Sequence, residues 1–196
     1  MKNKILFFPS LLLMVAVIIG CSSRTVTRVS PNEQIDLSGR WNDTDSRMVA
    51  NKMVQQIFSS PRYQQFKTQV GRNPTIIVGY VQNKTSEHID SDNYIKKFEM
   101  EIFNSGTADL VESGEFREKL REERADQQEF ASPETTAQWG KEFGADLMLF
   151  GTMTSETDSY NKKKVVNYIT TLYLTDLESN KRVWYGQEEI KKYITN

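Results

Sequence analysis

The chain has 196 residues, of which 38% are hydrophobic and 26% are charged, and its formal net charge is -1. This length suits one ordinary domain and little more. The near-neutral charge, with basic residues spread along the chain, argues against a nucleic-acid-binding protein. A single Cys and a single His exclude an intramolecular disulfide and a zinc site built from Cys and His ligands.

The N-terminus carries the pattern of a bacterial lipoprotein signal. Lys2 and Lys4 precede an apolar run over residues 5–19, which is typical of a secretory signal. The run is shorter than the roughly 20 residues that a membrane-spanning helix needs. It ends at residues 18–21 (Ile-Ile-Gly-Cys), which resemble the lipobox, where a peptidase cuts before a lipid-modified cysteine.

We therefore expect three segments: a lipoprotein signal peptide over residues 1–20, a lipidated Cys21 with a flexible tether over residues 21–36, and one globular domain over residues 37–196. The tether consists mainly of Ser, Thr, Arg, Asn, Gln and Pro without apolar periodicity. Its residues number about 15 and reach at most about 50 Å when fully extended. Ser22 resembles the position that sorts Gram-negative lipoproteins to the outer membrane, where the domain would face the periplasm.

The domain alternates helical and strand patterns along the chain. Apolar residues at helical spacing and N-cap residue types predict helices over 44–59, 94–103, 116–129 and 132–143. Pro61 should end the first helix, with a polar segment following it. Runs of β-branched and apolar residues predict strands over 75–81, 108–111, 146–153 and 165–174, and a last one from residue 183.

Helices and strands interleave early in the chain, and strands dominate its end. This order predicts an α/β fold, α+β by stricter usage, with a small mixed sheet of about four to five strands flanked by helices. The last three strands could form a meander.

The sequence contains no recognisable catalytic constellation. His88 lies in a polar loop, and no Gly-x-Ser-x-Gly elbow or phosphate-binding glycine loop is present. Asp43 and Asp45 are better explained by helix capping than by a cation site. The interspersed charges of residues 116–129 indicate a solvated helix face rather than a groove for acidic ligands. We predict no catalytic residue, cofactor, metal or small-molecule substrate.

Tyrosines are concentrated in the C-terminal third of the chain. Tyrosine and arginine are residue types that anchor protein interfaces, and we predict Tyr160, Arg182 and Tyr185 as partner contacts. The alternative is that half or more of these aromatic residues pack the sheet.

Several segments resemble the LpoB family of outer-membrane lipoproteins, which activate a bifunctional penicillin-binding protein. The most specific is residues 37–46 (Leu-Ser-Gly-Arg-Trp-Asn-Asp-Thr-Asp-Ser). Weaker similarity lies in residues 78–85, 143–146 and 183–184. The resemblance implies a TolB N-terminal-like fold, no catalysis, and binding to a non-catalytic domain of the synthase. Members of that family can carry a long Pro-rich linker, whereas this tether is short.

The expected function is therefore a lipid-anchored activator of a bifunctional class A penicillin-binding protein, which stimulates peptidoglycan synthesis from the outer membrane. The alternative is a structural lipoprotein subunit of a secretion or assembly complex similar to the curli pore. Strands of such pores alternate apolar and polar residues, and residues 165–174 show no lipid-facing apolar stripe.

Overall fold

The computed structural model of the protein describes residues 24–130, 132 and 144–195. The chain divides into two compact units, Met1–Glu33 and Gln34–Asn196. The predicted signal peptide, the predicted lipidation site Cys21 and nearly all of the helix predicted over 132–143 lie outside the described residues.

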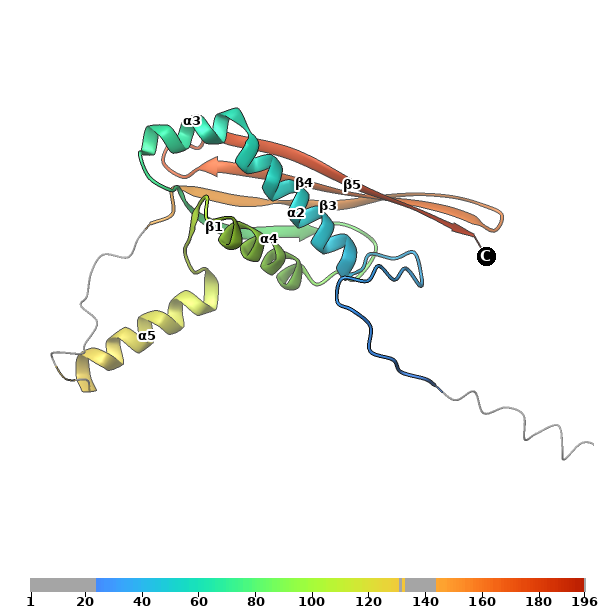
Figure 1. Cartoon of the computed structure of the whole chain (residues 1–196), viewed down its shortest axis with the longest axis horizontal. Coiled ribbons are helices and arrows are strands. Elements are labelled where there is room, and N and C mark those ends of the chain that lie inside the picture. Colours follow the sequence, from blue (N-terminus) through green and yellow to red (C-terminus); the bar gives the residue numbers. More distant parts are fainter. Residues whose placement is uncertain (1–23, 131, 133–143, 196) are drawn as a thin grey trace, which may run out of the picture. The chain divides into compact units, whose positions relative to one another are not determined.

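In this described part, four helices and five strands form the second unit (Figure 1). The helices are α2 (Asp43–Ser59), α3 (Pro61–Val70), α4 (Ser91–Ser105) and α5 (Gly114–Phe130). The strands are β1 (Thr75–Asn83), β2 (Asp109–Leu110), β3 (Leu147–Tyr160), β4 (Lys163–Asp176) and β5 (Arg182–Thr195).

The strands form one mixed sheet in the order β2-β1-β3-β4-β5. β1 is parallel to both β2 and β3, whereas β3, β4 and β5 are joined as antiparallel neighbours. The prediction of an α+β fold with a small mixed sheet is confirmed, and so is the meander of the last three strands. β3 extends seven residues beyond its predicted end at residue 153, because its outer half is polar and carries no apolar signal, whereas β4 is only two residues longer at each end than predicted.

The first helix, α2, ends before Pro61, as predicted, but the polar segment after it is a helix that was not predicted. Pro61 occupies the first turn of α3, directly after α2. Ser60 caps this helix by accepting a hydrogen bond from the Tyr63 amide, and Gly71 ends it in the left-handed conformation. Proline is favoured in the first helical turn because its missing N–H has no intrahelical partner there. The polar composition of α3 concealed the helix from an analysis of apolar spacing.

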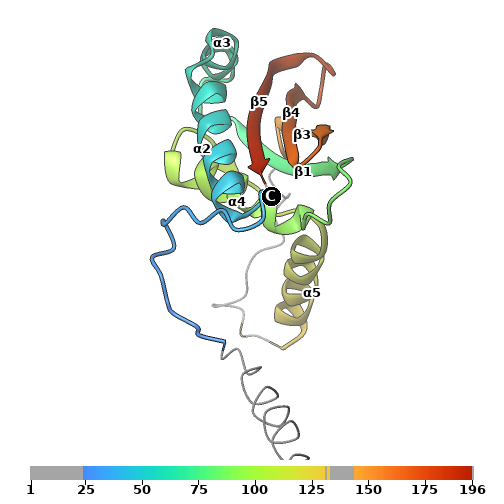
Figure 2. The same ribbon diagram turned by 90° about the vertical axis from the view of Figure 1, so that its right-hand side faces the viewer.

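The core lies between the sheet and the helices α2 and α4. Figure 2 shows these helices and α3 on one side of the sheet, and α2 contacts both α4 and β5. Strand residues that point toward the helices alternate with residues on the opposite side, which we call the open face. The largest fully buried side chains are Tyr63, Tyr168, Phe98, Met53, Ile57, Ile76, Ile102, Leu147, Leu149, Met153, Leu172 and Leu174.

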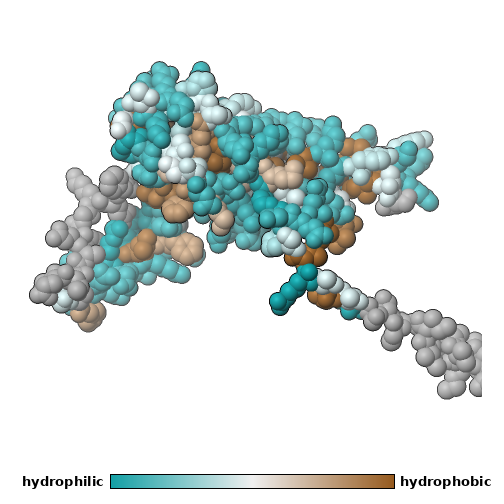
Figure 3. Space-filling view, viewed as in Figure 1, coloured by the Kyte–Doolittle hydropathy of each residue, from teal (hydrophilic) through white to brown (hydrophobic). Residues whose placement is uncertain are grey.

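The surface seen in Figure 3 is mostly hydrophilic over the helices. No residue of α5 is buried, which confirms the prediction that its charges are solvated. None of the helices in residues 24–130 and 144–195 combines the length and the apolar character needed to cross a bilayer.

Candidate functional site

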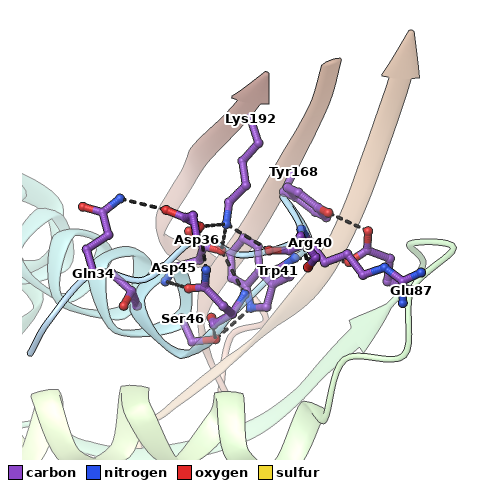
Figure 4. Close-up of polar contacts among 12 residues, drawn as sticks. Gln34, Asp36, Arg40, Trp41, Asp45, Ser46, Glu87, Tyr168 and Lys192 are labelled. Carbon is purple, nitrogen blue, oxygen red and sulfur yellow. Dashed lines mark hydrogen bonds and ion pairs between the residues drawn. The ribbon is translucent and has the colours of Figure 1, made fainter. Parts of the chain in front are cut away.

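Residues 34–41, which we call the strap, lie at the C-terminal end of β5 (Figure 4). The ammonium group of Lys192 donates to a carboxylate oxygen of Asp36 at 2.6 Å and to the carbonyl oxygen of Arg40 at 2.9 Å. The same ammonium forms an ion pair with Asp45 at 2.6 Å. The side chain of Lys192 is only 10% exposed and that of Asp45 only 5%. One buried lysine thus holds both the strap and the first turn of α2.

Close packing also fixes the strap to the strand. Gly39 has a φ of +68°, and a Cβ atom at this position would approach the Ile194 side chain to 2.4 Å. A residue with a side chain would therefore meet both backbone strain and a steric clash. The glycine allows the strap to lie directly on the end of β5.

Asp45 has a second role, because it completes the cap of α2. The Asn42 side chain accepts from the Asp45 amide at 3.1 Å, and the Asp45 carboxylate accepts from the Asn42 amide at 2.9 Å. This capping box confirms that Asp45 caps the helix. Asp43, in the same turn, pairs with Arg47 at 3.5 Å. The carboxylate of Asp45 therefore accepts from the helix cap and from Lys192 at once.

Trp41 closes the strap over the edge of the core. Its ring makes edge-to-face contacts with Tyr94 and Tyr168 at centroid distances of 5.7 and 5.4 Å, and its indole N–H donates to Ser46 at 2.7 Å. Glu87 accepts from the Trp41 amide at 3.2 Å and from the Tyr168 hydroxyl at 2.7 Å. Burial, together with this hydrogen bond to Glu87, raises the pKa of Tyr168, so its hydroxyl remains a neutral donor.

The charges of the strap stabilise one another. The hydrogen bond from Lys192, followed by one from Gln34, lowers the pKa of Asp36. Burial acts to lower the pKa of Lys192, but its bonds to Asp36 and Asp45 outweigh burial and raise it. Both groups therefore remain ionised around neutral pH. The network stabilises the fold and does not serve as an acid–base pair.

A second cluster lies on the open face of the sheet. Tyr80, Phe150, Tyr173 and Tyr185 come from four adjacent strands and form a row that we call the aromatic ladder. Successive centroids are 6.0, 5.6 and 5.3 Å apart. The guanidinium of Arg182 lies over the Tyr173 ring, 4.3 Å from its centroid. Tyr80 and Tyr185 are more than half exposed, so the ladder presents rigid aromatic surface to solvent.

The structure brings two of the three predicted contact residues together. Arg182 and Tyr185 both contact Tyr173. Tyr160, which is 77% exposed, lies elsewhere, since it pairs with Lys163 at the turn between β3 and β4. Lys163 and Tyr173 are separated along β4 by about 33 Å at about 3.3 Å per residue. The three residues therefore do not form one patch.

The residues considered for chemistry are dispersed. His88 is exposed in the loop after β1, which agrees with its interpretation as a solvated histidine. Within residues 24–130, 132 and 144–195, no group of three or more His, Cys, Asp and Glu side chains has the geometry of a metal site. The candidate site therefore consists of a binding surface, the aromatic ladder, and a structural network in which Lys192 holds the strap against β5.

The sequence identified Arg182 and Tyr185 as separate contact residues but not the aromatic ladder that they join, and it did not show the contacts of the strap. The contact between Lys192 and Asp36 spans 156 positions, and no local pattern signals it. The aromatic ladder had a weak signal, because strand periodicity alone places Phe150 and Tyr173 opposite to the core-facing residues of β3 and β4. Recognising the ladder also requires the register in which the strands pair, which strand periodicity does not give.

The sequence model of a family described as "Peptidoglycan-synthase activator LpoB" matches residues 45–190. A comparison with curated proteins finds no match.

Among solved structures, the LpoB C-terminal domain from Escherichia coli is similar at 15% identity and a TM-score of 0.43, over 78% of this chain and 99% of that one. The corresponding Salmonella enterica domain is similar at 13% identity and a TM-score of 0.39, over 72% and 97%. Lipoprotein GNA1162 from Neisseria meningitidis is similar at 18% identity and a TM-score of 0.41, over 61% and 83%.

Proposed function

Because the chain belongs to the family of the peptidoglycan-synthase activator LpoB, we propose that it is a lipid-anchored periplasmic regulator that binds and activates a bifunctional class A penicillin-binding protein. The observation that carries this proposal is the family match over residues 45–190, which includes almost all of the sheet and the helices. In this proposal the partner performs the chemistry of peptidoglycan synthesis, and this chain is not an enzyme.

The membrane attachment proposed here rests on Cys21. The apolar run before it and the Ser22 after it favour lipidation and delivery to the outer membrane. An anchor with several acyl chains is stable rather than reversible. The domain would then remain near the periplasmic face of that membrane, within the reach of a short tether.

We assign the contact with the synthase to the aromatic ladder and Arg182. Exposed tyrosine and arginine side chains are the types that dominate binding energy at protein interfaces. Here Arg182 and Tyr185 are held against Tyr173 before any partner binds, so less side-chain entropy is lost on association. The partner surface would be a non-catalytic domain of the synthase.

Activation would follow from preferential binding. A partner that binds the active conformation of the synthase more tightly than the inactive one shifts the population toward the active form. The size of the activation is then limited by the difference between the two affinities. No chemical group of this chain needs to enter the active site of the synthase.

The test is an affinity titration of the mature chain against each bifunctional penicillin-binding protein of the host, coupled to assays of lipid II polymerisation and cross-linking. Saturable binding with faster synthesis supports the proposal. Replacing Arg182 or Tyr185 with Ala should weaken binding about tenfold or more. Tyr193→Ala is the matched control, because Tyr193 is an equally exposed tyrosine on the same side of β5.

A Tyr160→Ala variant tests the third predicted contact separately. Unchanged affinity would restrict the interface to the ladder. A complete absence of binding to every bifunctional synthase would contradict the proposed function and would direct attention to a secretion or assembly complex.

A further inference from the structure

The hairpin of β3 and β4 projects from the body of the domain (Figure 1). The first half of β3 alternates between buried and partly buried residues, but every residue from Glu156 to Tyr160 is exposed. The turn consists of Asn161 and Lys162, with Asn161 in the left-handed conformation at φ +53°. In Figure 3 the projecting end is pale to teal, with brown residues where it joins the body.

This projecting end has a distinct composition, and we call it the hairpin tip. It consists of exposed residues from β3, β4, β5 and the turn between β3 and β4: Tyr160, Lys162, Lys163, Lys164, Lys191 and Tyr193. Tyr160 and Tyr193 are 77% and 62% exposed. The described residues 159–166 and 190–195 contain no Asp or Glu, and an exposed carboxylate, Asp158, borders them on β3, where it pairs with Val165. The tip is therefore basic and aromatic in a chain whose net charge is close to zero.

The strap brings the start of the domain to the same end of the sheet. It is held by Lys192 and packs on Ile194, and Ile194 is paired with Lys164 of the tip. Lys192 lies about 10 Å along β5 from the strand's last residue, Thr195, which pairs with Lys163. Gln34, the first residue of this unit, thus leads into the domain beside the hairpin tip.

Tether length then limits where the tip can be. Cys21 and Gln34 are joined by about 13 residues, which reach at most about 45 Å when fully extended and much less on average. If Cys21 is anchored in a bilayer, the lysines and tyrosines of the tip are confined close to its headgroups. Confinement of this kind raises the effective concentration of a weak binding site to a level at which it is occupied.

We propose that the hairpin tip is a membrane-contacting surface, which binds the anionic phosphate headgroups of the leaflet that holds the lipid anchor. This inference rests on the proposed lipidation of Cys21. Lysine side chains are attracted to anionic bilayer surfaces, and tyrosine rings favour the boundary between headgroups and acyl chains. The tip offers both at the point where the chain enters the domain.

Contact at the tip has a consequence for the aromatic ladder. The ladder lies about 33 Å along β4 from the turn, at about 3.3 Å per residue. A domain that stands on its hairpin tip would hold Arg182 and Tyr185 away from the membrane by about that length. The hairpin then acts as a rigid spacer that supplements the short tether.

The experiment measures binding to vesicles without the lipid anchor. The mature chain with Cys21→Ser is titrated against vesicles of phosphatidylcholine alone and against vesicles of equal parts phosphatidylcholine and phosphatidylglycerol. We expect binding to the anionic vesicles only, and weaker binding at high salt. Replacement of Lys162, Lys163 and Lys164 with Gln should weaken binding about 10- to 100-fold.

Two further variants separate the tip from general electrostatics. Replacement of Lys84, Lys96 and Lys97 with Gln removes the same charge from exposed or partly exposed positions outside the hairpin and should change the affinity less than about twofold. Tyr160→Ser combined with Tyr193→Ser should weaken binding several-fold without changing its salt dependence. Circular dichroism on every variant verifies that the fold is retained.

Three results would overturn the membrane contact: no binding to anionic vesicles, equal binding to both kinds of vesicle, or an equal loss of affinity in the tip variant and in the Lys84, Lys96 and Lys97 variant. Sedimentation with purified peptidoglycan but not with vesicles would also overturn it. A chain that binds anionic vesicles through the tip but activates no synthase would leave the membrane contact standing and remove only the proposed function.

Discussion

Lys192, near the end of the last strand, forms a 2.6 Å ion pair with Asp45 in the first turn of the first described helix. Both side chains are nearly buried, and the lysine also holds Asp36 of the strap. A buried charge is costly unless it is paired and hydrogen-bonded. In the described structure, Lys192 and Asp45 are each paired. Removing one of these charges would leave the other buried without a counter-charge, which is destabilising.

Replacing Lys192 with Met should lower the free energy of unfolding by about 2–4 kcal/mol, because the buried Asp45 carboxylate loses its counter-charge. Denaturation by urea measures this loss. Hydrogen exchange should also become faster at the amides of the strap, which Lys192 holds in place. Lys191→Met is the matched control, and equal effects of the two substitutions would contradict the role assigned to Lys192.

The contribution of the strap should depend on pH only at the extremes. The pKa of Asp36 is lowered from 3.8, so its stabilisation is complete above pH 3.8 and is lost as the pH falls through the lower folded-state pKa. The pKa of Lys192 is raised from 10.5, so its stabilisation is complete below pH 10.5 and is lost as the pH rises further.

A comparison of the wild type with Asp36→Asn measures this dependence. The difference in urea midpoint should be constant between about pH 5 and pH 9 and should shrink below about pH 4. A difference that already changes near pH 6 would show that another group controls the strap.

Gly151 should tolerate no side chain. A Cβ atom there would come within 2.0 Å of the Thr171 carbonyl oxygen and 3.0 Å of the Leu172 Cα. Because these are backbone atoms of the neighbouring strand, Gly151→Ala should destabilise the fold by about 3 kcal/mol or more. Thermal denaturation measures this loss. Gly144→Ala is the control and should be nearly neutral, because nothing lies within 4 Å of a Cβ atom at that position.

The hydroxyl of Tyr168 should contribute more to stability than that of Tyr173, which lies on the opposite face of β4. Tyr168 donates to Glu87 at 2.7 Å, and a hydrogen bond to a charged group contributes about 1.5–3 kcal/mol. Tyr168→Phe should therefore lower the unfolding free energy by about 1–2 kcal/mol, because Glu87 keeps its bond to Trp41. Tyr173→Phe, which keeps the ring contacts of the ladder, is the control and should change stability by less than about 0.5 kcal/mol.

Cys21→Ser should abolish incorporation of labelled palmitate and move the protein from the membrane fraction to the periplasmic fraction. This outcome follows from the proposed lipidation of Cys21, because loss of all acyl chains removes stable anchoring. Ser22→Ala, which keeps the cysteine, is the control. Labelling that persists in the Cys21→Ser chain would contradict the assigned lipidation site.

Local patterns sufficed for most of the fold. The β-branched run from Thr75 predicted β1, and apolar residues at helical spacing predicted most of α4, because these signals depend only on neighbouring residues. α3 was missed because it has little apolar periodicity. The polar outer half of β3 was missed because pairing with β4, rather than burial, stabilises it.

The candidate site depended on information that the sequence does not display. The resemblance of residues 37–46 to a known family identified a segment but not its contacts, which are made with residues far along the chain, such as Glu87 and Lys192. Composition alone selected Arg182 and Tyr185 and could not show that Tyr160 lies at the other end of the sheet. Strand register decides that question, and register is a property of the folded sheet.

The contacts between the strap and β5 have a consequence for the order in which the proposed export, lipidation and folding occur. If the chain is exported as proposed, the strap cannot close until the last strand has left the translocation machinery, because that strand supplies Lys192 and Ile194. Contacts between such distant parts of a chain form late and slow folding. The enzymes that the proposal requires to lipidate Cys21 and cleave the signal would therefore act while the domain that follows is still unfolded.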